Sequence, residues 1–268
     1  LISKIIAMLT RIIFVFSSVS PKFFFMPYLI NNLICYLLRR NKIERVNSLN
    51  RKKYVICFFQ DGKLFLYSSL LTLVYTKAND IILTTTTSYS NLAVYNVALT
   101  LSFAWTFVPL SIGTSYLSRA IGTKNDNDFI NVHKYMLLSS LPFLILLYLL
   151  SGLIVDILFD ASYSDVKDIL FILSVSSFLS TLNVINNRII GAFGGDRYLT
   201  KKIIVCSLVS IFISLCFIGK FGLIGAAYAC LFSELLNLTV GNYFFKTKSI
   251  LHYHVKSALG LFNDKLRR

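Results

Sequence analysis

The sequence is poor in charged residues, and acidic residues are especially few. Only 15% of the 268 residues are charged, with 12 Asp and Glu against 27 Lys and Arg. A soluble domain carries roughly 25% charged residues, so this chain lacks the polar surface that a water-facing globule needs. With 4 Pro and 12 Gly, it also lacks the composition of a disordered or collagen-like chain.

Cysteine and histidine are also scarce, and their spacing excludes the common metal and disulfide patterns. The cysteines form no C-x-x-C pair, which predicts buried free thiols at Cys35, Cys57, Cys206, Cys216 and Cys230. His133, His252 and His254 lie in segments expected to be cytoplasmic, and the pair His252 and His254 is predicted to be solvated, since it has no third ligand nearby. No nucleophile stands beside a base, and residues 191–196 lack the phosphate-loop pattern. We therefore expect no metal, no cofactor and no enzymatic activity.

Long apolar runs dominate the remaining sequence. Hydrophobic residues make up 56% of the chain, and its mean hydropathy is +0.68. A bilayer core requires about 20 mostly apolar residues per helix. Eight runs meet this need, at 3–19, 22–38, 63–83, 90–118, 135–159, 167–190, 202–219 and 222–245. The sequence predicts an all-α integral membrane protein, a polytopic bundle of about eight transmembrane helices, with a kink near Pro109 and Gly113 in the fourth.

The basic residues gather in alternate linkers. They concentrate in 39–63, 119–134, 191–202 and the tail from 246, whereas 84–90 carries no charge. By the positive-inside rule the basic linkers and both termini are cytoplasmic, and 84–90 lies outside. The net charge of +15 thus orients the chain in membrane lipids and predicts no nucleic-acid partner. In the tail, 247–268, apolar residues recur at helical spacing, which predicts an amphipathic helix on the anionic inner leaflet.

The beginning of the chain repeats part of its end. Lys4-Ile5-Ile6 matches Lys202-Ile203-Ile204, and at the same offset Lys22-Phe23 matches Lys220-Phe221. The match indicates a parallel repeat, as in two-lobe transporters. We therefore assign 1–38 to the last two helices of an N-terminal lobe, 39–62 to a cytoplasmic linker and 63–246 to a six-helix C-terminal lobe. The repeat then implies four further helices before this chain, and so a parent with twelve helices; the first residue, Leu1 rather than Met, agrees with this expectation.

Several segments resemble one transporter family. Tyr75–Leu83, Ala93–Ala98, Ala104–Pro109 and Ile112–Ser115 resemble the seventh and eighth helices of bacterial Wzx-type O-antigen and polysaccharide flippases. These belong to the multidrug/oligosaccharidyl-lipid/polysaccharide exporter superfamily. Lys220–Ala227, continuing to Ser233 and Glu234, resembles the start of that family's last helix. The resemblance covers essentially the whole chain and implies the last eight helices of a 6+6 transporter.

The resemblance also implies a function. Such proteins move oligosaccharide repeat units linked to undecaprenyl diphosphate across the bacterial inner (plasma) membrane by alternating access. Other polysaccharide assembly proteins are implied partners. A central cationic cavity suits this cargo, because Arg and Lys compensate a diphosphate while Asn and Tyr hydrogen-bond sugar hydroxyls.

Charged and polar residues at membrane depth are the candidate cavity groups, because burying them in lipid is costly. They are Arg11, Lys77, Asp80, Arg188, Glu234, Asn31, Asn183, Asn187 and Tyr95. Each has a structural alternative. Lys77 and Asp80 could simply pair with each other, and Arg188 could extend to the interface. Glu234 could bond to a neighbouring helix or carry a proton, and the amides could join helices.

Three other functions stay open at this point. A drug or metabolite exporter of the same superfamily would have a smaller, acidic cavity. A membrane polysaccharide polymerase or acyltransferase would need a large outward loop or a membrane-embedded base, and the outward linkers are short. An inactive fragment of an interrupted gene is the third alternative.

Overall fold

The computed structural model describes residues 10, 26–40, 51–245 and 249–263, and these residues are helical apart from short turns. The chain divides into two compact units, residues 1–60 and 61–268, which are treated separately below. In the first unit, helix α2 spans Met26–Arg40. The predicted helix at 3–19 and the linker residues 41–50 lie outside the described residues.

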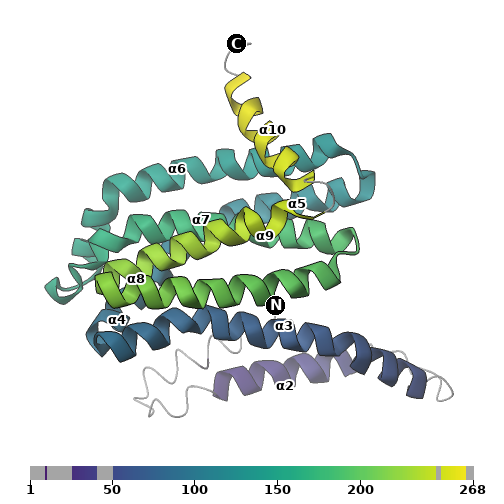
Figure 1. Ribbon diagram of the computed structural model, residues 1–268, viewed down its shortest axis with the longest axis horizontal. Helices are drawn as coiled ribbons and strands as arrows, with labels where there is room; N and C mark the ends of the chain where they lie inside the picture. The colour runs from purple at the N-terminus through teal and green to yellow at the C-terminus, as the bar shows by residue number, and fades with distance from the viewer. Residues whose placement is uncertain (1–9, 11–25, 41–50, 246–248, 264–268) are drawn as a thin grey trace. The chain divides into compact units, whose positions relative to one another are not determined.

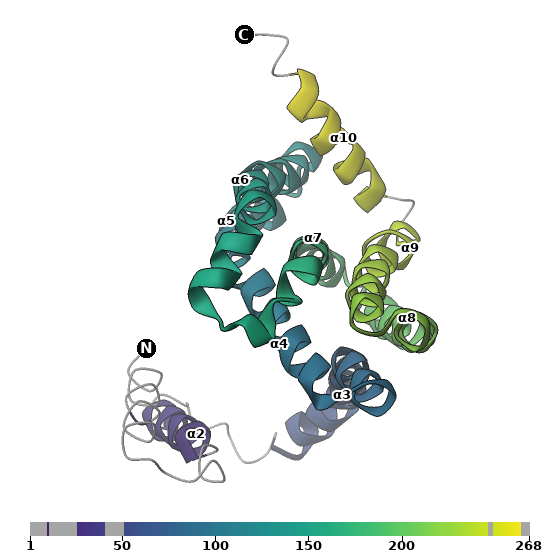
Figure 2. The same cartoon turned by 90° about the vertical axis from the view of Figure 1, so that its left-hand side faces the viewer.

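The rest of the chain is a series of helices joined by short turns (Figure 1). They are α3 (Arg51–Thr86), α4 (Tyr89–Ala104), α5 (Phe107–Thr123), α6 (Asp126–Leu158), the 3-10 turn η3 (Ala161–Tyr163), α7 (Val166–Ala192), α8 (Asp196–Leu238), α9 (Val240–Tyr243) and α10 (Ser249–Asn263). Helix α7 packs against α4, α5, α6 and α8, and Figure 2 shows it among them. The all-helical membrane architecture expected from the sequence is confirmed.

Three described helical stretches are long and apolar enough to cross a membrane: α6, α7 and Asp196–Tyr243. The last of these folds back on itself at Gly222, which has φ 56° and ψ −126°. That backbone conformation favours glycine, and a side chain at Gly225 would collide with the Phe217 backbone as the chain reverses. The two arms correspond to the predicted spans 202–219 and 222–245.

The predicted span at 90–118 is broken into α4 and α5, which meet at 44°. The predicted kink in this span is therefore present, and the bend lies at Trp105 and Thr106, one turn before Pro109. A proline has no N–H for the carbonyl four residues earlier, and its ring clashes with that carbonyl. The Trp105 carbonyl instead accepts from the Val108 N–H at 3.2 Å. Proline thus displaces the helix break toward the N-terminus.

Helix α3 is long, but it does not meet the same test of apolarity. Its 36 residues include the predicted span 63–83. Lys77, Asn79 and Asp80 interrupt the apolar run within that span. The predicted span 63–83 is therefore less apolar than α6, α7 and Asp196–Tyr243, because it contains these polar residues.

Candidate functional site

Two of the predicted cavity residues cannot be placed beside the others. Arg11 lies outside the described residues. Asn31 is a half-buried residue of α2, in the first unit. Their roles therefore stay predictions from the sequence.

Two predicted cations, Lys77 and Arg188, are exposed and already have partners. Lys77 Nζ lies 2.7 Å from Asp80 Oδ2, and the lysine side chain is 62% exposed. This is the mutual pairing considered from their spacing, and such an exposed pair contributes only about 0–1 kcal/mol. Arg188 Nη1 donates to Thr114 Oγ1 at 2.8 Å, which joins α7 to α5. Neither the Lys77 ammonium nor the Arg188 guanidinium is buried, so both side chains remain accessible to a ligand.

A second group of polar side chains connects α3 with α4 and with both arms of α8. Tyr75 donates to Glu234 Oε1 at 3.0 Å. Asn79 Nδ2 donates to the Tyr95 hydroxyl at 3.2 Å, and Ser214 donates to Asn79 Oδ1 at 2.5 Å. Tyr95 and Glu234 are both buried. These two predicted residues therefore form interhelical hydrogen bonds, the structural alternative considered for them.

The third group brings Asn183 and Asn187 of α7 together around a lysine of α8. Lys202 Nζ donates to Asn183 Oδ1 and to Asn187 Oδ1, both at 2.7 Å, and to Asn242 Oδ1 of α9 at 2.8 Å. Lys202 is only 6% exposed and Asn242 is fully buried. By sequence, Lys202 belongs only to a basic linker, and Asn242 is not among the predicted site residues. The Asn183–Asn187 spacing, one helical turn on an apolar helix, was the signal for a shared polar face.

Of the two histidines predicted to be solvated, His252 is exposed but His254 is half-buried. His133 of α6 is buried, with Nδ1 2.9 Å from the Phe129 carbonyl oxygen and Nε2 2.8 Å from Asn186 Oδ1. Asn186 Nδ2 in turn donates to His254 Nε2 of α10 at 3.2 Å. Packing of α10 on α6 brings His254 beside His133 and Asn186, a long-range effect that linker composition does not show.

Helix α10 has two different faces. Ile250, Tyr253 and Ser257 are buried, and the Tyr253 hydroxyl donates to Asp126 Oδ1 at 2.8 Å. Burial, followed by the hydrogen bond and the negative charge of Asp126, raises the pKa of Tyr253 well above its usual range. Val255 and Leu259, part of the stripe predicted to meet the inner leaflet, are exposed. The helix can therefore contact protein on one face and lipid on the other.

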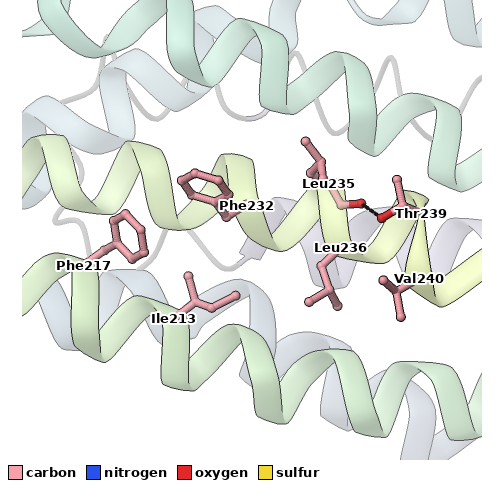
Figure 3. A pocket seen from close by; sticks show the side chains of 7 residues that line it. All are labelled: Ile213, Phe217, Phe232, Leu235, Leu236, Thr239 and Val240. Carbon is pink, nitrogen blue, oxygen red and sulfur yellow. Dashed lines mark hydrogen bonds between the residues drawn. The ribbon is translucent and has the colours of Figure 1, made fainter.

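An apolar groove of about 310 Å³ separates the two arms of α8 (Figure 3). Its walls include Ile213, Phe217, Phe232 and Leu236. The hydroxyl of Thr239, at its edge, donates to the Leu235 carbonyl oxygen at 2.7 Å and is thus used within the helix. The groove contains none of the predicted cavity residues and is suited to hydrocarbon.

Metal binding has no support in the part of the chain that the structure describes. No group of three or more His, Cys, Asp or Glu residues there could hold an ion. Cys206 is a buried thiol, as predicted, whereas Cys216 is exposed and Cys230 is half-buried.

Comparison with known proteins finds a transporter of the same fold. No family profile and no curated protein sequence matches the chain. Among solved structures, the lipid II flippase MurJ in an inward closed conformation is similar, with a TM-score of 0.66 and 17% sequence identity. The match covers 99% of this chain and 59% of the MurJ chain. This chain therefore has the fold of a MurJ-like membrane transporter and spans somewhat more than half of that transporter's length.

Proposed function

We propose that this chain is the C-terminal two-thirds of a flippase for lipid-linked oligosaccharides in the bacterial inner membrane. In this proposal the cargo is an O-antigen or polysaccharide repeat unit on undecaprenyl diphosphate. The complete protein moves it by alternating access between two six-helix lobes. The observation that carries the proposal is the MurJ-like fold along 99% of the chain. The residues that resemble polysaccharide flippases support the choice of cargo.

The contacts divide the predicted polar residues into two roles. We assign cargo binding to Arg11, Lys77 and Arg188, because Lys77 and Arg188 are exposed and a guanidinium or ammonium can compensate a diphosphate. Asp80 holds Lys77 in place, and Asn31 supplies an amide for sugar hydroxyls. Tyr95, Asn183, Asn187 and Glu234 instead join helices.

This division makes α3 and α7 the elements that carry charge to the cargo. The interhelical bonds of Tyr95 and Glu234 hold α3 against α4 and α8. Those of Asn183 and Asn187 hold α7 against α8. Rigid packing of this kind lets a lobe move as one body when access alternates.

Arg11 provides the sharpest test of the cargo. In the twelve-helix parent, Arg11→Ala should abolish surface polysaccharide while the protein stays in the membrane at normal amounts. Arg11→Lys should keep part of the activity, because the charge remains although the bidentate fork is lost. The measurements are surface polysaccharide, membrane protein level and undecaprenyl diphosphate-linked repeat units retained inside the cell.

The controls separate the alternatives. Arg268→Ala removes a cation from the tail and should leave export unchanged. Normal export by Arg11→Ala would reject a cargo role for Arg11. In vesicles containing the parent, transfer of lipid II but not of oligosaccharide-linked lipid would reject the proposed cargo. Export of small cationic drugs by the parent, without lipid transfer, would instead support the drug-exporter alternative.

A further inference from the structure

The Lys202 ammonium is surrounded by the amide oxygens of three asparagines from two segments of the chain. Asn183 and Asn187 lie on α7, and Asn242 lies on α9. Their Oδ1 atoms are 2.7, 2.7 and 2.8 Å from Nζ. An ammonium group has three N–H donors, and each is used by one of these oxygens.

Two further hydrogen bonds orient the amide of Asn242. Asn242 Nδ2 donates to Asn183 Oδ1 and to the Leu238 carbonyl oxygen, both at 3.1 Å. The nitrogen side of Asn242 is therefore occupied, and its oxygen points to Lys202. The three amide oxygens form a cage around Lys202 Nζ.

The backbone leaves room for the lysine side chain to enter this cage. A Cβ at Gly241 would come within 2.8 Å of Lys202 Cε and 3.2 Å of Cys206 Sγ. A side chain at that position would displace the lysine stem. The buried position of the Lys202 side chain therefore requires a glycine at position 241 of α9.

Among the described residues the ammonium has no salt-bridge partner, although the carboxyl group of Glu234 acts on its charge from a greater distance. A lysine is almost never fully buried unless it is paired with an opposite charge. A cation solvated only by carbonyl oxygens resembles instead an alkali ion, whose water shell is replaced by carbonyl dipoles.

We propose that Asn183, Asn187 and Asn242 form a site for a monovalent cation that the Lys202 ammonium permanently occupies. The cation is tethered to α8, so the cage joins α7, α8 and α9 without a free ion. A cage emptied of the lysine takes an ammonium-sized ion, K⁺ or NH₄⁺. This inference concerns the cage alone and holds whatever cargo the complete protein carries.

Lys202→Ala tests the proposal, with Lys201→Ala as the matched control because Lys201 is its exposed neighbour. The purified chain is unfolded thermally in KCl, NH₄Cl or N-methyl-D-glucamine chloride at equal ionic strength. Lys202→Ala should be less stable than the unmodified chain in the organic salt and should regain stability in K⁺ or NH₄⁺. A cation at about 100 times its Kd shifts the folding equilibrium about 100-fold. For the unmodified chain and for Lys201→Ala, the unfolding temperature should be the same in all three salts.

Two results would overturn the proposal. One is a Lys202→Ala variant whose midpoint does not depend on the identity of the cation. If Lys202→Ala does not fold, the test uses a second variant, Asn187→Asp, which places a carboxylate beside Nζ. With the ammonium in the cage this variant should unfold at the same temperature as the unmodified chain or higher. A lower midpoint would mean that no cation is present to compensate the new charge.

Discussion

At the residue scale, the contacts separate exposed charges from buried polar bonds. Lys77 and Asp80 form an exposed pair on α3, whereas Glu234 is buried and accepts a hydrogen bond from Tyr75 on another helix. The spacing of Lys77 and Asp80 was sufficient to anticipate their pairing, because residues three apart share a helix face. The partner of Glu234 lies 159 residues away, and no local pattern could identify it.

The Tyr75–Glu234 bond leads to a stability prediction. Tyr75→Phe removes the donor and leaves Glu234 Oε1 buried without that bond, which should cost about 1–3 kcal/mol of unfolding free energy. Tyr89→Phe is the control, because Tyr89 is 81% exposed, and it should have no effect. The measurement is denaturant or thermal unfolding of the purified chain in detergent. Equal stability of the two variants would show that the bond is not formed.

At the element scale, the packing of α10 should depend on pH through His254. His254 lies between Asn186 and Tyr243, with Nε2 accepting from the Asn186 amide and Nδ1 3.1 Å from the Tyr243 hydroxyl. Burial, with a smaller contribution from nearby His133, lowers the pKa of His254 to about 3. Protonation would turn Nε2 into a donor facing the Asn186 N–H. The docked helix therefore requires neutral His254.

The sign of the pH dependence follows from the two pKa values. In an undocked helix His254 should have its ordinary pKa of about 6.5. The packing of α10 on α6 is thus most stable above pH 6.5. Its equilibrium constant falls about tenfold for each unit of pH below 6.5, until the pH reaches the pKa of about 3 that His254 has in the packed helix. Limited proteolysis of α10 should become faster over that range.

Two histidine variants check the cause of this change. His254→Asn removes the titrating group and should make proteolysis independent of pH across the same range. His252→Asn changes an exposed neighbour and should leave the pH dependence as it was. A pH dependence that survives His254→Asn would assign the effect to another group, such as His133 or the Tyr253–Asp126 pair.

The bend between α4 and α5 also belongs to this scale. Pro109 was visible in the sequence, and its chemistry accounts for the break at Trp105 and Thr106. The break falls one turn before Pro109 because a proline disrupts the hydrogen bond to the carbonyl four residues before it. The buried face of α10 could not be anticipated in the same way, since Ile250, Tyr253 and Ser257 are buried through packing with other helices.

At the scale of the whole molecule, orientation in the membrane is the main prediction. The alternation of basic and uncharged linkers places 84–90 outside and 119–134 in the cytoplasm. In a variant lacking the five native cysteines, Thr87→Cys should react with a membrane-impermeant thiol reagent in intact cells. Asn127→Cys should react only after the cells are opened. Both positions are exposed, so the opposite labelling pattern would reverse the orientation and the direction of transport.

The sequence by itself determined that the chain is helical and lies in a membrane. In lipid every backbone polar group must be bonded within the structure, so apolar runs of this length form helices whatever their neighbours are. The placement of Lys and Arg likewise predicts orientation from local composition. Helix formation and membrane orientation each depend on segments of about 20 residues, so they can be predicted from each segment by itself.

Only the tertiary structure decided which polar residues meet. Lys202 belonged to a basic linker by composition, yet the packing of α7, α8 and α9 buries it among three asparagine oxygens. The packing of α10 connects His133 with His254 through Asn186, although the two histidines lie far apart in the sequence. The physical reason is that hydrogen bonding of a side chain depends on atoms within about 3 Å, and helices distant in sequence supply those atoms.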